Sequence, residues 1–167
     1  MNTSWMILVL LMVLLVSPAL GDSGAERESL KGLTGVQVVV ENMQPDATRD
    51  GLKSSTLQRD VEQRLRQAGI RVPGEAEWLM APGRPTLYLH VNALKSPPGI
   101  YAICIKLHLF QTARLTRDTT VISPVITWSA TETIGTISAE RLSQVRNAVP
   151  DLVNQFINAY LTANPKR

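Results

Sequence analysis

Two stretches of alternating apolar and polar residues, joined by a proline-rich turn, constrain the fold of this chain more than any other feature. Residues 87–93 and 103–109 each place an apolar side chain at every second position, which puts those side chains on one face of a strand. Ser96-Pro97-Pro98-Gly99 lies between the two runs and has the composition of a tight turn. The sequence therefore predicts an antiparallel hairpin with a purely aliphatic face, which must pack on helices, and a second face of mixed character.

Two further segments have the composition of strands. Residues 36–41 are short and rich in β-branched side chains, which favours a strand that is covered on both faces or placed centrally. Residues 121–133 form a longer run that Gly135 ends, and Pro124 restricts the start of this run to a sheet edge or a bulge. Three shorter segments complete this part of the prediction: a strand over residues 70–72 and loops over residues 42–51 and 75–85.

Two segments have the apolar spacing of helices. The first begins at Ser55, which is a good N-cap, with Gln58 placed to complete a capping box and Gly69 placed to end the helix. The second begins after Ser138, and Pro150 interrupts it, so we expect a kink or two helices with Pro150 in the first turn of the second. Both helices carry an apolar stripe. We therefore predict an α+β fold, with a mostly antiparallel sheet of about four to five strands and two helices packed on one face.

The hairpin register also predicts which polar side chains share the mixed face. With the pairing centred on the two prolines, three cross-strand pairs fall there: Asn92 with Cys104, His90 with Lys106, and Tyr88 with His108. Both histidines of the chain lie on this face, beside aromatic and hydrogen-bonding groups. A flat surface of this kind suits contact with a protein or a glycan. The candidate binding residues are Tyr88, His90, Asn92, Lys106, His108 and Phe110.

An enzyme or a metal-dependent module would have to use the same face. A catalytic or metal-binding role requires the histidines to converge with a carboxylate or a thiolate, whereas the expected neighbours of His90 are Lys106 and Tyr88. A lysine beside His90 disfavours both the imidazolium form and a bound cation. The sequence contains no Gly-rich phosphate loop, Gly-x-Ser-x-Gly elbow or Cys-x-x-Cys motif, and its spacing gives no sign of a hydrolase built on Ser129. We therefore predict no catalytic residue, no metal ligand and no cofactor.

The N-terminal residues divide the chain into three parts. Residues 1–21 have the layout of a secretory signal peptide, because an apolar run is followed by a proline and small residues. A retained membrane anchor is the alternative, but the apolar run is about half the length that a membrane-spanning helix needs. Residues 22–32 are charged and lack periodicity, which predicts a flexible leader, and residues 33–167 are predicted to form a single α+β domain. We expect a periplasmic or secreted protein with no stable membrane span after signal cleavage.

Charge and cysteine content narrow the classes of partner. The chain carries 17 Lys and Arg against 14 Asp and Glu, for a formal net charge of +3, and its basic residues are spread rather than clustered. Aromatic residues make up only 5% of the sequence, so the basic stripe with interleaved aromatics that nucleic-acid binding requires is missing. The lone Cys104 cannot form an intramolecular disulfide, and its place in a strand pattern predicts a buried, unreactive thiol.

Six short segments, taken together in order and spacing, resemble the landmarks of a known family. They are Gly32-Leu33-Thr34-Gly35-Val36, Val38-Val39-Val40-Glu41-Asn42, Leu57-Gln58-Arg59-Asp60-Val61-Glu62, Leu65-Arg66-Gln67-Ala68-Gly69-Ile70, Thr127-Trp128-Ser129 and Phe156-Ile157-Asn158-Ala159-Tyr160. The chain resembles an uncharacterised family of exported bacterial proteins over about residues 33–166. The resemblance implies export and a fold, and it supplies no activity. The order of elements is also similar, more loosely, to small periplasmic α/β domains of envelope-assembly proteins and lipoproteins.

Two hypotheses of function follow. The first is an exported, non-catalytic binding or accessory protein of the bacterial cell envelope, whose partner is an envelope protein or a glycan and not a nucleic acid. The second is a periplasmic enzyme or metal-dependent module that uses the face bearing His90 and His108. A carboxylate or thiolate beside either histidine would favour the second hypothesis.

Overall fold

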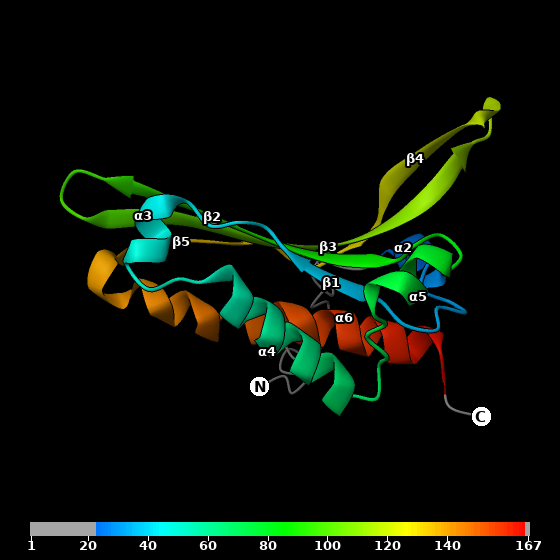
Figure 1. Cartoon of the computed structure of the whole chain (residues 1–167), viewed down its shortest axis with the longest axis horizontal. Helices are drawn as coiled ribbons and strands as arrows, with labels where there is room; N and C mark the ends of the chain where they lie inside the picture. Colours follow the sequence, from blue (N-terminus) through cyan, green and yellow to red (C-terminus); the bar gives the residue numbers. More distant parts are fainter. Residues whose placement is uncertain (1–22, 166–167) are drawn as a thin grey trace, which may run out of the picture.

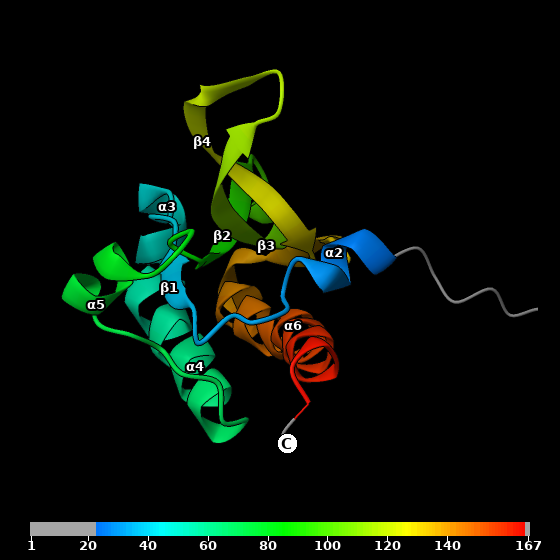
Figure 2. The same ribbon diagram turned by 90° about the vertical axis from the view of Figure 1, so that its right-hand side faces the viewer.

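Figures 1 and 2 show a computed structural model with two main layers, a five-stranded sheet and, on one face of it, the helices α4 (Ser54–Gln67) and α6 (Val149–Ala163). The structure describes residues 23–165, so the predicted signal peptide over residues 1–21 lies outside the described residues. The predicted α+β fold is confirmed. The remaining elements are α2 (Gly24–Glu28), β1 (Gln37–Val40), α3 (Pro45–Arg49), α5 (Glu75–Met80), β2 (Thr86–Ser96), β3 (Ile100–Leu115), β4 (Asp118–Ser129), β5 (Thr133–Ser138) and the 3-10 helix η1 (Ala139–Asn147).

The long strand β3 organises the sheet. The strand order is β1-β2-β3-β4, and β5 also pairs with β3. β1 runs parallel to β2, and the other three pairs are antiparallel. β3 pairs first with β5 and then with β4, so these two strands together form one edge of the sheet. Pro124 lies in this edge, where a residue without an N–H group is tolerated.

The hairpin of β2 and β3 has the predicted register. Its three expected cross-strand pairs are all present: Tyr88 with His108, His90 with Lys106, and Asn92 with Cys104. The aliphatic side of both strands is almost completely buried, at 6% exposure or less, through Leu87, Leu89, Val91, Ala93, Ile105, Leu107 and Leu109. Burying a leucine or isoleucine in this way stabilises the fold by roughly 1.5–3 kcal/mol. This side of the hairpin therefore anchors the sheet to the helical layer.

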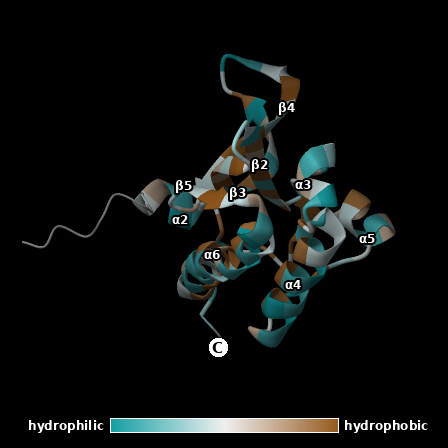
Figure 3. Cartoon of the chain, turned by 90° about the vertical axis from the view of Figure 1, so that its left-hand side faces the viewer, coloured by the Kyte–Doolittle hydropathy of each residue, from teal (hydrophilic) through white to brown (hydrophobic). Residues whose placement is uncertain are grey.

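The helices α4 and α6 supply the other half of the core. Leu57, Val61 and Leu65 are the buried positions of α4, and the α6 residue Phe156 packs edge-on against Trp128 with ring centroids 5.2 Å apart. Figure 3 shows that the outer side of α4 is largely hydrophilic. The amphipathic pattern of each helix therefore sets which of its sides faces the sheet.

The ends of these helices confirm part of the prediction. Gly69 adopts a left-handed conformation after α4 (φ +78°), and Pro150 lies in the first turn of α6, directly after η1. The predicted capping box is wrong, because α4 begins at Ser54 without a side-chain cap. The amide of Gln58 instead donates to Glu62 Oε1 at 3.0 Å, one turn along the helix.

Within the predicted flexible leader over residues 22–32, the described residues 23–32 are ordered. Ser23 and Glu26 form a capping box at the start of α2, and Leu30 is fully buried in the core. The side chain of Asn164 accepts from the Gly32 N–H at 2.7 Å and donates to the carbonyl of Leu30 at 2.9 Å. A charged segment is thus held by one apolar side chain and by hydrogen bonds from the far end of the chain.

Several boundaries within the fold also differ from prediction. The expected loops over residues 42–51 and 75–85 contain the short helices α3 and α5, and residues 70–72 do not form a strand. The expected strand over residues 121–133 ends at Ser129, and β5 follows it with Gly135 inside it rather than beyond its end. Both strands run antiparallel to β3 and pair with successive parts of it, and residues 130–132 separate them. No helix within residues 23–165 has both the length and the apolar character needed to cross a membrane.

Candidate functional site

The face of the sheet that points away from α4 and α6 has no helix of the described chain over it (Figures 1 and 2). We call this surface the open face and define it by Glu41, Tyr88, His90, Asn92, Cys104, Lys106, His108, Phe110, Ser129 and Glu132. All six predicted binding residues lie on the open face, and each is half-buried. Their grouping follows directly from the period of two along a strand and from the register of the hairpin.

The first row of side chains across the open face joins β4, β3 and β2. Ser129 lies opposite His108 in the ladder, and its hydroxyl is 3.0 Å from His108 Nδ1. Phe110 packs edge-on against Tyr88 at 5.8 Å and against His108 at 6.4 Å. Burial, reinforced by the charge of Lys106, lowers the pKa of His108. His108 therefore favours its neutral form, in which one ring nitrogen donates and the other accepts.

The second row is charged and contains two carboxylates that the sequence did not predict as neighbours of this face. Glu41 Oε2 pairs with His90 Nδ1, and Lys106 Nζ lies 2.8 Å from Glu132 Oε1. The hydrogen bond from His90 is the main cause that lowers the pKa of Glu41, and the bond to Glu132 raises the pKa of Lys106. The expected neighbours of His90 were incomplete, because its strongest contact is the Glu41 carboxylate and not Lys106.

The position of Glu41 has a simple structural cause. β1 pairs in parallel with β2, and Val40 lies beside Leu89, so the next residue on each strand falls on the same row. The N–H of Glu41 continues the ladder by donating to the carbonyl of Leu89 at 3.0 Å. A carboxylate directly after a short β-branched strand is the signal that could have found this contact, once β1 is known to neighbour β2.

The serine beside His108 also corrects the sequence analysis, which found no sign of Ser129 near a histidine. The bond between Ser129 and His108 arises because β4 pairs with β3 at that row. Within residues 23–165, no carboxylate forms a hydrogen bond or an ion pair with His108. The nearby carboxylate of Glu41 pairs with His90. The arrangement therefore provides a serine and a histidine but lacks the third group that would orient the ring for catalysis.

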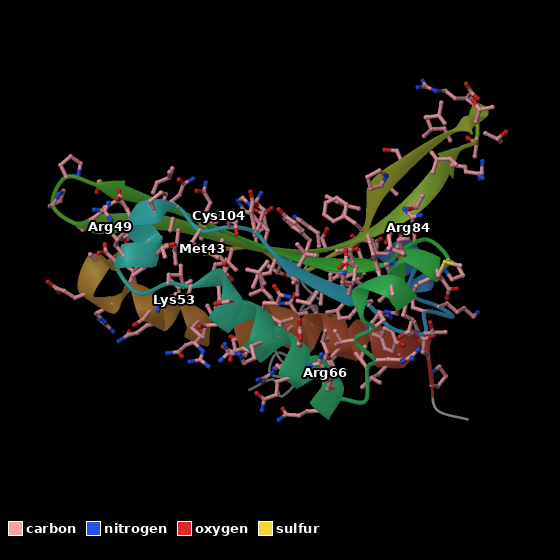
Figure 4. The ribbon with its side chains drawn as sticks, in the orientation of Figure 1. Met43, Arg49, Lys53, Arg66, Arg84 and Cys104 are labelled. Carbon is pink, nitrogen blue, oxygen red and sulfur yellow. The ribbon has the colours of Figure 1, made fainter. Side chains whose placement is uncertain are left out.

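The remaining part of the open face is less polar. Cys104 is half-buried rather than buried as predicted, and it lies between Asn92 on β2 and Ile134 on β5. Figure 4 shows Cys104 on the long hairpin of the sheet. Ile134 and Leu94 are 76% and 59% exposed, so the surface becomes aliphatic toward the turn of the hairpin. The open face thus grades from aromatic and charged groups at its centre to an apolar end.

The geometry of the open face suits contact rather than enclosure of a small molecule. Two well-formed pockets of the described chain lie among the helices, and no residue of the open face lines either of them. Residues 23–165 contain no group of three or more His, Cys, Asp or Glu side chains that could hold a metal ion. A sheet surface with paired charges and edge-on aromatic rings offers hydrogen bonds and apolar contact to a large partner.

Comparisons with known proteins add little to this site. No protein-family model matches the sequence, and no curated protein matches it either. Among solved structures, the chain is similar to PelC from Paraburkholderia phytofirmans, which is described as a dodecamer. The two share 19% sequence identity with a TM-score of 0.40, over 76% of this chain and 89% of the PelC chain. A likeness this distant transfers no function to the present chain.

Proposed function

We propose that this chain is an exported, non-catalytic binding or accessory protein of the bacterial cell envelope, and that it contacts an envelope protein or a glycan through the open face. The observation that carries the proposal is a sheet face that lacks helical cover in the described chain and bears all six predicted binding residues. The proposal of export, and of a periplasmic or secreted location, rests on the sequence of residues 1–21 and on the family resemblance.

The side chains of the open face are held in place before any partner arrives. Phe110 is fixed by edge-on contacts with two rings, and His90 and Lys106 are each tied to a carboxylate. Side chains that are already ordered lose less conformational entropy on binding, which favours affinity. Aromatic side chains are also enriched among the residues that dominate binding energy at interfaces. Tyr88 and Phe110 are therefore the expected centre of the contact.

Photocrosslinking tests this proposal. A photoreactive phenylalanine analogue would replace Tyr88 or Phe110, and a control protein would carry it at Arg66, an exposed position on α4. The three proteins would be irradiated in envelope extract and their adducts compared. We expect a discrete adduct from each of the two open-face positions and none from the control. An excess of the natural protein, which lacks the photoreactive group, should suppress these adducts by competing for the partner. Adducts of equal yield at all three positions, or none at the open face, would contradict the proposal.

A second candidate function is a periplasmic enzyme or a metal-dependent module that uses the same face. The pairing of Ser129 with His108 is the specific observation in its favour, together with the Glu41 contact to His90. A fluorophosphonate probe distinguishes the two functions, because it labels a serine only when a neighbouring base activates it. Labelling that is present in the natural protein and lost in Ser129→Ala would support the enzyme. Our proposal predicts no labelling of either protein.

A further inference from the structure

A groove runs along α4 on the helical side of the molecule, where none of the open-face residues lies. It consists of two adjoining pockets of about 290 and about 330 Å³, and Arg146 and Asn147 line both of them. One wall is α4 with the residue before it, from Lys53 to Gln67, and the other is η1 with the start of α6. At 1.5 Å per residue, the α4 wall is about 21 Å long. A groove of this length suits a segment of an extended polymer better than one small molecule.

The charge of the groove is positive. Its lining residues include the three cations Lys53, Arg64 and Arg146, and Asp60 is the single carboxylate among them. Asp60 is already bound to Arg146, whose Nε and Nη2 contact both carboxylate oxygens. Arg64 donates through Nε to the uncharged amide of Asn154 at 2.9 Å, and within residues 23–165 no ion pair neutralises Arg64 or Lys53. Two positive charges therefore remain available, about 16 Å apart along the helix axis.

The uncharged part of the lining indicates what kind of anion fits. Its polar members carry amides and hydroxyls: Thr56, Gln63, Gln67, Ser143, Gln144 and Asn147. Amides and hydroxyls both donate and accept hydrogen bonds, as the hydroxyls of a sugar do. The large apolar residues below them, such as Leu57, Val61 and Val153, are about 1% exposed. These three side chains therefore contribute little to the exposed lining of the groove, which leaves its amides and hydroxyls accessible.

From this lining we infer that the groove binds a segment of an acidic polysaccharide, with sugar carboxylates against Lys53 and Arg64 and sugar hydroxyls against the amides between them. The ion pair of Asp60 and Arg146 sits midway along the groove and holds its two walls together. Asp60 also repels an anionic ligand and occupies Arg146. Removing its charge should consequently strengthen binding, whereas removing either flanking cation should weaken it.

Calorimetric titration of the mature protein tests this inference. The probe is a hexamer of galacturonic acid, with maltohexaose as the uncharged comparator and oligoglutamate as the acidic peptide. We expect only the galacturonate to bind, more weakly as salt is added. Lys53→Gln and Arg64→Gln should each weaken binding about fivefold, the scale of one partly exposed charge contact. Asp60→Asn should strengthen it by a similar factor.

The matched control is Arg66→Gln. Arg66 lies on the same helix and carries the same charge, but it pairs with Glu62 and does not line the groove. Figure 4 shows Lys53 and Arg66 near opposite ends of α4. Any of four results would overturn the inference. The control could lose as much affinity as the groove variants, Asp60→Asn could bind with unchanged affinity, galacturonate could fail to bind, or oligoglutamate could bind equally well. Melting temperatures measured on the same samples would show that the variants are folded.

Discussion

Leu30→Ala tests most directly whether the segment before β1 belongs to the folded core. The Leu30 side chain is 0% exposed, although it lies in a segment whose composition predicts flexibility. The substitution removes three carbon atoms, which costs about 2.4 kcal/mol at roughly 0.8 kcal/mol for each. The surroundings are held by the Asn164 bond to the Leu30 carbonyl and cannot fully collapse. With the residual cavity added, the expected loss in free energy of unfolding is about 3–4 kcal/mol.

Urea unfolding followed by tryptophan fluorescence would measure this loss. Leu94→Ala is the matched control, because the same change is made at a side chain that is 59% exposed, and it should cost less than about 0.5 kcal/mol. In thermal melts the Leu30 variant should unfold about 10 °C earlier, at about 3 °C for each kcal/mol in a domain of this size. If the two variants lost the same stability, the segment would be no part of the core and our description of it would be refuted.

Two further predictions concern the backbone and pH. An added Cβ at Gly35 would lie 2.6 Å from the carbonyl oxygen of Arg71, so Gly35→Ala should lower the free energy of unfolding in urea by about 2–3 kcal/mol. Gly74 has open space where a Cβ would lie, and Gly74→Ala should cost under about 1 kcal/mol. Equal effects would contradict this. Because burial keeps the pKa of His108 below its ordinary value of 6.5, the unfolded chain takes up that proton first as the pH falls. The stability that this group contributes is therefore present above about pH 6.5 and is lost below it. His108→Gln should flatten that part of the curve of urea midpoint against pH. A curve unchanged by the substitution would contradict this role of His108.

Much of the sheet could be predicted because its strongest signals are local. Alternation along β2 and β3, with the proline turn between them, was enough to give the pairing of His90 with Lys106 and of Tyr88 with His108. The division of the C-terminal segment into η1 and α6 at Pro150 was predictable for the same reason, since a missing N–H acts within one helical turn. Local signals alone therefore place the six candidate residues together on one face.

The carboxylates of the open face could not be predicted because they arrive through pairings between distant segments. Glu41 reaches His90 only because β1 and β2 pair in parallel across 49 residues of sequence. Glu132 reaches Lys106 because β5, which begins at the next residue, pairs with β3. Neither pairing leaves a mark in local composition. The groove could not be predicted for the same reason. The polar residues of α4 have the sequence pattern of an ordinary solvated surface, and they line a groove only because η1 packs beside them.

The N-terminal segment over residues 23–32, whose composition predicts flexibility, also helps to shape the open face. The ladder between β3 and β4 passes from Leu109 with Trp128 to Phe110 with Ile126, which leaves Thr127 as an unpaired bulge residue. Ser29, just after α2, donates to the Thr127 carbonyl at 3.0 Å, and Gln111 donates both to the Ser29 carbonyl and to the Thr127 hydroxyl.

Beyond this bulge the hairpin of β3 and β4 bends away from the helices, as Figure 1 shows. Phe110 also pairs regularly with Thr86 on β2, which the bulge in β4 does not disturb. Phe110 therefore stays on the open face, where it packs against Tyr88. Because bonds from Ser29 and Gln111 hold the bulge residue, the N-terminal segment positions the aromatic centre of the proposed contact surface from behind. Loosening that segment should therefore weaken partner binding even though it contains no open-face residue.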